Sequence, residues 1–156
     1  MDPTDLKIIA LLQQNGRATQ LEIAQLVGLS QPAVAERIRK LEERGFVTGY
    51  TALVDAVKLG KDITAFISVG IEHPRFFERF GEKICSLPEV LECHRVAGPA
   101  SYILKVRTDN TKTLDKLLVE TIRIIEWVTH TDTTIVLKSI KETTKIDVTS
   151  TTLGGE

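Results

Sequence analysis

The sequence is poor in the residues that build metal and redox centres. Its 156 residues include two cysteines, Cys85 and Cys93, and three histidines. The cysteines are too far apart for a CxxC motif, and the local sequence does not complete a zinc site. We therefore expect both cysteines to be core or partly buried residues, and we expect no metal and no cofactor.

Recognisable catalytic patterns are also missing. The chain has no Ser/His/Asp constellation, paired carboxylates, phosphate-binding loop or metal-ligand spacing. His73, His94 and His130 are scattered along the sequence, where a surface or structural role is commoner than catalysis. The sequence thus predicts a protein that is not an enzyme.

Long apolar runs are absent as well. No run is long enough to span a bilayer, and Met1–Gly16 lacks a basic segment followed by an apolar one. We expect no membrane partner and a cytoplasmic location. The hydrophobic content of 42% is enough for a folded core, in one domain or two small ones.

Two short helices joined by a tight turn are predicted between residues 19 and 44. Thr19 and the glutamate three residues later can form a capping box at the start of the first helix. Gly28 stands where a helix end favours positive φ, and Ser30 can cap the second helix. The geometry is that of a helix-turn-helix.

The two helices have distinct faces. The first has an apolar face made of Leu21, Ala24 and Val27. At about 100° per residue, the second has one apolar stripe and one largely basic stripe beside it. The apolar stripe is Val34, Ile38 and Leu41, and the other is Ala33, Arg37, Lys40 and Arg44. One stripe can pack while the other faces an anion.

This spacing is typical of a DNA-binding helix-turn-helix, whose second helix enters the major groove N-terminus first. The candidates for base edges are Gln31, Pro32, Ala33, Glu36 and Arg37, and those nearer the phosphates are Ser30, Lys40 and Arg44. The alternative is a helical hairpin with a solvated charged face, in which Arg37 makes only a local ion pair.

The sequence also lacks an excess of positive charge. The net charge is −1, and residues 1–50 carry six basic and six acidic side chains. The charges are sorted and not in excess, so a monomer would neutralise few phosphates. DNA affinity would then need two or more copies on one DNA.

A third helix precedes this pair. Asp2 can cap it, with Pro3 at its first position and Asp5 near the positive end of its dipole. It should end at Asn15 and Gly16. The N-terminal part is therefore a three-helix unit.

The remaining chain alternates strands and helices. After an extended connector or edge strand that ends in a turn around Gly60, the predicted order is βαββαβ. The strands are Ile63–Ile71, Val90–Ala97, Tyr102–Val106 and Thr133–Ile140; one helix begins near Pro74 and buries Phe76, Phe77, Phe80 and Ile84, and the other is marked by Leu114, Leu117, Leu118, Ile122 and Ile125.

This order predicts a split βαβ fold, with two helices on one face of a four-stranded antiparallel sheet. The strands look too apolar for their other face to be solvated, so we expect two chains to pair sheet to sheet as a homodimer. The predicted parts are a helix-turn-helix domain at 1–46, a connector strand and linker at 47–61, a second domain at 62–148 and a flexible tail at 149–156.

Several segments resemble the Lrp/AsnC family of bacterial and archaeal regulators. They are TDLKII at 4–9, NGRAT at 15–19, residues 28–50, AG and SY within 97–102, and the strand from Thr129. The resemblance implies an α+β chain, in which a DNA-binding helix-turn-helix precedes a ferredoxin-like ligand-sensing domain. It also implies dimers that gather into octamers and bind amino acids between dimers.

One loop departs from the family pattern. The family's effector loop commonly carries the motif GDxDY, whereas this chain has Gly98, Pro99, Ala100, Ser101 and Tyr102. By the resemblance, these residues with Thr131 and Thr133 are the candidate effector site. Both loop acids are missing, and Pro99 removes an amide donor.

A buried ammonium needs an acceptor, so the missing acids bear on the effector. We expect weak binding of amino acids, or preference for a large apolar or aromatic one. The alternative is that Glu92 or Glu120 replaces the lost acid. For the whole chain the alternative to a DNA-binding regulator is a ligand-sensing oligomeric module without DNA-binding activity.

Overall fold

The computed structural model describes residues 1–148 and divides the chain into two compact units. Among the described residues, the first unit is Met1–Leu53 together with residues 142–148, and the second unit is Val54–Lys141. The predicted flexible tail at 149–156 lies outside the described residues.

The first unit holds helices α1 (Pro3–Gln14), α2 (Gln20–Val27) and α3 (Gln31–Glu43). Their starts confirm the predicted caps. Asp2 and Thr19 each form a capping box, and the Ser30 hydroxyl accepts a hydrogen bond from the Ala33 amide at 3.4 Å. Gly28 ends α2 with φ of 72°, a left-handed conformation that favours glycine.

The small core of the first unit lies between its three helices. It consists of Ile8, Ile23, Ala24, Val34, Ile38 and Leu41. The apolar stripe predicted for α3 is thus confirmed. The face predicted for α2 was partly wrong, because Leu21 is 54% exposed while Ile23 is fully buried. The short helix turns Ile23 and Ala24 toward α1 and α3, which leaves Leu21 outside.

An ion-pair cluster joins α1 to α3. Nη1 of Arg37 lies 2.6 Å from a carboxylate oxygen of Asp2 and 2.6 Å from one of Asp5. The Asp5 side chain is only 13% exposed. The Asp5 backbone amide and the Arg37 guanidinium lower the pKa of Asp2. Arg37 therefore serves the packing of the unit in this structure.

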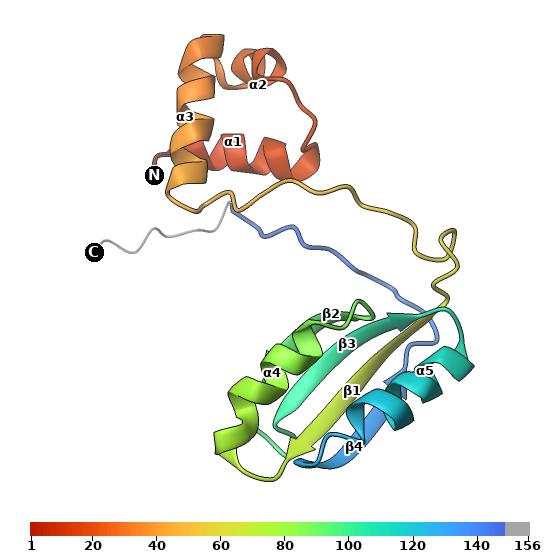
Figure 1. Cartoon of the computed structure of the whole chain (residues 1–156). Coiled ribbons are helices and arrows are strands. Elements are labelled where there is room, and N and C mark those ends of the chain that lie inside the picture. The colour runs from red at the N-terminus through yellow and green to blue at the C-terminus, as the bar shows by residue number, and fades with distance from the viewer. Residues whose placement is uncertain (149–156) are drawn as a thin grey trace. The chain divides into compact units, whose positions relative to one another are not determined.

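The second unit is a four-stranded antiparallel sheet with strand order β2-β3-β1-β4. Its elements are β1 (Ile63–Ile71), a 3₁₀ turn (Pro74–Phe76), α4 (Phe77–Cys85), β2 (Val90–Arg95), β3 (Tyr102–Thr108), α5 (Thr111–Leu117), a π-helical turn (Leu118–Ile122) and β4 (Val128–Ile135). Both helices cover one face of the sheet (Figure 1). The predicted βαββαβ order and the α+β ferredoxin-like class are confirmed.

The core of the second unit lies between that face and the helices. Ala65, Ile67 and Val69 of β1 are fully buried there, as are Phe80 and Ile84 of α4. Residues of β3, of α5 and of the segment from the π-helical turn to β4 complete the core, namely Tyr102, Leu104, Val106, Leu114, Leu117, Leu118, Ile122 and Ile125. Alternation along the strands puts the intervening residues on the helix-free face.

The helix-free face is more polar than the sequence suggested. Strand register places on it Thr64, Phe66, Ser68, Glu92, His94, Ile103, Lys105, Arg107, His130, Asp132 and Thr134. The large apolar residues among them are Phe66 and Ile103. The expectation of an apolar face was wrong because the β-rich runs alternate in polarity once their register is fixed.

Several predicted strand bounds also differ from the structure, since β2 ends at Arg95 and not at Ala97, and β3 continues past Val106 to Thr108. The last strand is Val128–Ile135 and not Thr133–Ile140, because β4 can extend only where β1 supplies partners. Beyond it, Leu137 is 97% exposed. Residues 47–61 form no strand, since no neighbouring backbone of the described chain bonds to them as a ladder, although the predicted turn is present with Gly60 at φ of 75°.

The chain returns to the first unit after the second. The Gln13 side chain in α1 donates to the Ile146 carbonyl at 3.0 Å and accepts from the Ile146 amide at 2.7 Å. The second unit accordingly ends at Lys141, earlier than the domain end predicted at residue 148.

Two glycines provide a matched test of backbone conformation. We expect Gly28→Ala to lower the free energy of unfolding by about 1 kcal/mol, because its φ of 72° is strained for alanine. Gly81→Ala, in the middle of α4 with no atom near its added Cβ, should raise it by about 0.5–1 kcal/mol. Urea unfolding followed by circular dichroism measures both, and a shift of the same sign in the two variants would contradict this account.

The ion pairs of Arg37 should make the stability of the protein depend on pH in the acidic range. A carboxylate with a lowered folded-state pKa contributes stability that is present above its unfolded value of 3.8 and is lost as the pH falls through the folded value. Thermal melts between about pH 5 and about pH 2 should therefore fall more steeply for the wild type than for Arg37→Met. Arg17→Met, at an arginine outside the cluster, is the control, and equal slopes for wild type and Arg37→Met would contradict the assignment.

Candidate functional site

The outward face of α3 carries charges of both signs. Pro32, Glu36, Arg39, Lys40 and Glu43 are exposed there. Arg39 binds Glu36 at 2.7 Å and also pairs with Glu43, while Lys40 Nζ lies 3.4 Å from Glu36. The hydrogen bond from Arg39, with a smaller contribution from Lys40, lowers the pKa of Glu36 to about 2 against the opposing effect of burial. The cations on this face of the helix are therefore already paired with acids of the same helix.

Most of the predicted DNA-binding residues lie together. A hollow of about 340 Å³ beside α3 is lined by Asp5, Ala33, Glu36, Arg37, Lys40, Leu41 and Arg44. Gln31 and Pro32 are exposed in the first turn of α3, and Ser30 caps it. Arg37 is held by the carboxylates of α1, and the Arg44 guanidinium lies 5.0 Å from the centre of the Phe46 ring.

Sequence reasoning missed Arg39. Its spacing of three residues from Glu36 and four from Glu43 is the usual signal for ion pairs along a helix. With Lys40 it supplies the cations at the centre of the outward face, so Arg39 belongs with the candidate residues of α3.

The predicted effector loop connects β2 to β3. Its Ser101 is fixed against the end of β1, since its amide donates to the Val69 carbonyl at 2.9 Å and its hydroxyl accepts from the Ile71 amide at 3.1 Å. Tyr102 is 6% exposed, and its hydroxyl donates to the Phe77 carbonyl at 3.0 Å. Both residues therefore make hydrogen bonds within the fold, although the Ser101 hydroxyl oxygen can accept a second one. Gly98, Pro99 and Ala100 lie outside the strands.

The strand register brings the loop near the predicted threonines. Val69 of β1 pairs with Tyr102 on one side and with Thr131 on the other. Adjacent strands are separated by about 4.7–4.9 Å, so Tyr102 and Thr131 stand about 10 Å apart across the sheet. Thr133 lies two pairs further along, opposite Ile67, and its buried hydroxyl oxygen has no hydrogen-bond partner among the described residues.

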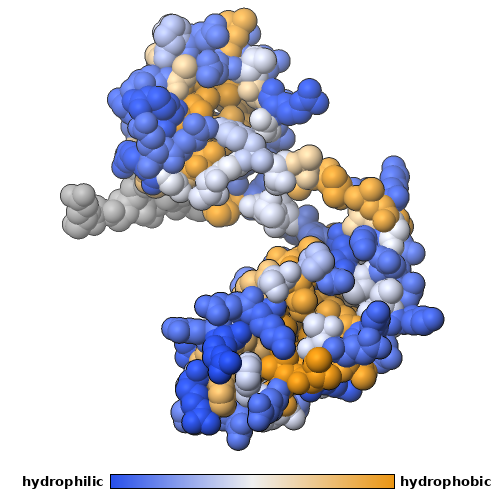
Figure 2. Space-filling model, in the orientation of Figure 1, coloured by the Kyte–Doolittle hydropathy of each residue, from blue (hydrophilic) through white to orange (hydrophobic). Residues whose placement is uncertain are grey.

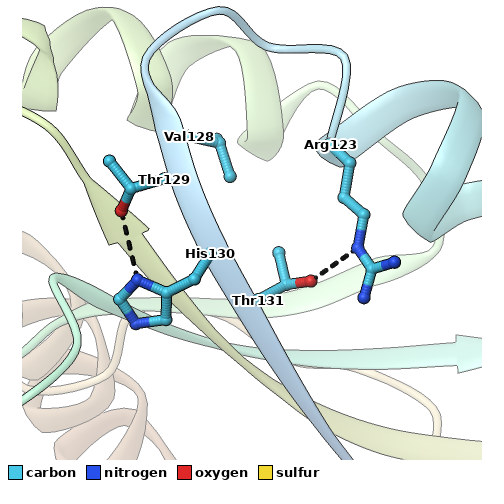
Figure 3. A pocket seen from close by; sticks show the side chains of 5 residues that line it. All are labelled: Arg123, Val128, Thr129, His130 and Thr131. Carbon is cyan, nitrogen blue, oxygen red and sulfur yellow. Dashed lines mark hydrogen bonds between the residues drawn. The ribbon is translucent and has the colours of Figure 1, made fainter.

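A hollow of about 370 Å³ opens at this end of β4. Figure 3 shows its lining residues, Arg123, Val128, Thr129, His130 and Thr131. Nε of Arg123 donates to the Thr131 hydroxyl at 2.8 Å, and His130 Nδ1 lies 3.1 Å from the Thr129 hydroxyl. Within residues 1–148 no carboxylate forms an ion pair with Arg123, so its terminal nitrogens can receive an anion.

Gly70 makes room for this arrangement. A Cβ atom at that position would lie 2.1 Å from Cε1 of His130 and 2.7 Å from the Thr129 hydroxyl oxygen. The imidazole therefore occupies the space that a side chain at Gly70 would need. Neither Arg123 nor His130 was among the residues predicted for the effector, because their positions depend on the register of β4 and on the turn before it.

The two acids considered as replacements for the loop acids are engaged elsewhere. Glu92 lies on the helix-free face, 3.2 Å from His94 Nε2 and 3.2 Å from Lys105 Nζ. Glu120 is paired with Lys116 at 3.9 Å. Neither acid lines the hollow at β4.

Two kinds of feature are absent from the described residues. In residues 1–148 no group of three or more histidine, cysteine, aspartate or glutamate side chains could hold a metal ion. No helix in the same range combines the length and the apolar character needed to cross a membrane.

The two halves of the chain match two domain families. Residues 1–48 match the family described as winged helix-turn-helix DNA-binding, and residues 64–146 match the Lrp/AsnC ligand binding domain. The YezC protein of Bacillus subtilis, an HTH-type transcriptional regulator, is 45% identical over 118 residues, which are 76% of this chain and 83% of YezC. The leucine-responsive regulatory protein of Escherichia coli is 34% identical over 148 residues, 94% of this chain and 90% of that protein.

Solved structures agree over nearly the whole chain. A transcriptional regulator of Neisseria meningitidis in complex with L-Met has a TM-score of 0.92 and 31% identity, with 96% of this chain and 97% of that chain covered. AsnC of E. coli has a TM-score of 0.87 and 28% identity, with coverage of 93% and 97%. The chain therefore belongs to the Lrp/AsnC family and is a DNA-binding transcriptional regulator.

Proposed function

We propose that this regulator reads specific double-stranded DNA with α3 and responds to an amino acid bound in the second unit. The observation that supports DNA reading is the turn from Gly28 to Ser30, which leaves the first turn of α3 exposed. The proposed contacts are Ser30, Gln31, Pro32, Ala33, Glu36, Arg37, Lys40 and Arg44, with Arg39 added. An exposed helix N-terminus is what a helix-turn-helix presents to base edges.

The proposed contact residues differ in which existing interactions they must give up to reach DNA. Gln31 and Pro32 are exposed, and Ser30 keeps a hydroxyl hydrogen to donate to a phosphate while its oxygen caps the helix. For Arg37 to reach a base, its guanidinium has to exchange the carboxylates of Asp2 and Asp5 for the base edge. Arg39 and Lys40 need only release exposed acids of their own helix.

The proposed effector is an amino acid, as the L-Met complex of the Neisseria relative suggests. Arg123 and Thr131 would bind its carboxylate, because a guanidinium pairs well with a carboxylate. Backbone carbonyls around Gly98–Ala100 and the hydroxyls of Ser101 and Thr133 are the proposed neighbours of the amine. No acid lines the hollow, which supports weak binding or a preference for a large apolar side chain.

The proposed working unit is a homodimer that assembles further to an octamer, in the cytoplasm and without catalytic activity. Support for assembly comes from exposed apolar side chains on the connector, Leu53, Val54, Val57 and Leu59, each at least 64% exposed. Figure 2 shows hydrophobic surface along this segment. The balanced charge of residues 1–50 also requires several copies to hold DNA at physiological salt.

A gel shift on the DNA upstream of the protein's own gene tests DNA binding, and binding should weaken as salt rises. In the same assay Glu36→Gln should bind unrelated DNA several-fold more tightly, since it frees Arg39 and Lys40 for phosphates. The slope of log K against log salt should steepen by about 1 for each additional phosphate that the freed cations neutralise.

Glu42→Gln is the matched control, because Glu42 is an exposed acid of α3 that bonds to the Tyr50 hydroxyl and not to a cation. Equal affinities of wild type, Glu36→Gln and Glu42→Gln for unrelated DNA would contradict the role of Glu36. No salt-sensitive shift with any DNA would favour the ligand-sensing module without DNA binding.

Isothermal titration with a panel of L-amino acids tests the effector site. Arg123→Gln should weaken binding about tenfold or more, the usual effect of losing a hydrogen bond to a charged group. Lys116→Gln, at a lysine whose side chain is 71% exposed, should leave the affinity unchanged. Ser101→Asp should tighten binding by restoring an acid to the loop. Unchanged affinity in folded Arg123→Gln would exclude this carboxylate site, and submicromolar binding of a small polar amino acid would contradict the expected preference.

A further inference from the structure

The two cysteines of the chain lie on neighbouring elements of the second unit. Cys85 is the last residue of α4, and Cys93 lies in β2, eight positions later. Cys93 pairs with Leu104 of β3, so its side chain is on the helix-covered face. Helix α4 packs on this strand, so Cys85 at the helix end and the inward side chain of Cys93 lie in the same layer, and the neighbouring Cys85 thiol affects the ionisation of Cys93.

The two thiols differ in access. Cys85 is exposed, whereas Cys93 is partly buried against the core of the second unit. Burial, followed by the neighbouring Cys85, raises the pKa of the Cys93 thiol to about 11. A small oxidant therefore meets Cys85 first, while Cys93 stays a protonated thiol beside it.

We propose that Cys85 and Cys93 form a reversible intramolecular disulfide when the protein meets a hydroperoxide. The Cys85 sulfur takes one peroxide oxygen as the O–O bond breaks, which yields a sulfenic acid and water. The Cys93 sulfur then attacks the sulfenic sulfur, the S–O bond breaks, and the leaving hydroxide takes the Cys93 proton as water. In total two thiols and one hydrogen peroxide give one disulfide and two waters.

The proposed disulfide would lie near Tyr102. Burial, followed by the neighbouring Cys93, raises the pKa of the Tyr102 hydroxyl, which donates a hydrogen bond to the Phe77 carbonyl in the first turn of α4. A disulfide would tie the end of α4 to β2, next to the residue at which β3 begins. This chemistry does not depend on the proposed effector or on DNA binding.

The sequence allows a direct test on the full-length protein. No lysine or arginine lies between Lys83 and Arg95, so one tryptic peptide, residues 84–95, carries both cysteines. After hydrogen peroxide treatment and alkylation, this peptide should be two hydrogens lighter and take up no alkyl group, and dithiothreitol should restore both thiols. Cleavage after Glu89 and Glu92 should leave two fragments joined only through sulfur.

Concentration and pH give further readouts. The yield of this peptide should not change on tenfold dilution of the protein, and it should form faster at about pH 9 than at about pH 7 because thiolate is the reacting form. Cys85→Ser, at the exposed position, should abolish the product while its circular dichroism stays that of the wild type. A wild-type peptide that gains only oxygen, or a disulfide that joins two chains, would overturn the proposal.

Discussion

The backbone ladder of β1 is the constraint on which the second unit depends. This strand is bonded to β3 on one side and to β4 on the other. It sets the length of β4, turns Phe66 to the helix-free face and aligns Tyr102 with Thr131 through their shared partner Val69. At its far end it fixes Ser101 through Val69 and Ile71. The effector candidates are thus placed by backbone geometry before any ligand is present.

The first unit depends on charge pairing in a different way. Its core is small, and the cations of α3 are shared out among acids of α3 and α1. Such exposed pairs add little stability in water, so exchanging them for phosphates costs little. The ion pair between Arg37 and Asp5 is the exception, because the Asp5 side chain is largely shielded from solvent. The outward face of α3 is therefore not a permanently positive surface, and in the proposed mode of binding its cations would exchange acids for phosphates.

The features that the sequence predicted well are those decided locally. Asp2, Thr19 and Ser30 cap helices because each meets an amide only three residues away. The features it did not predict depend on distant partners. The bounds of β4 follow from pairing with β1, and the position of Arg37 follows from the packing of α1 on α3. Arg123 takes its place beside Thr131 only through the turn into β4. A strand in the connector would likewise need a partner backbone, which the described chain does not offer.

The hydrogen bonds between Gln13 and Ile146 make the first unit discontinuous in sequence. Its helices come from the beginning of the chain, but a segment beyond the second unit belongs to it as well. Insertion of one folding unit within another gives the inserted unit two covalent attachments. A strain that arises in the sheet can then be passed along either connection, through the residues before Ile63 or through those after Ile135.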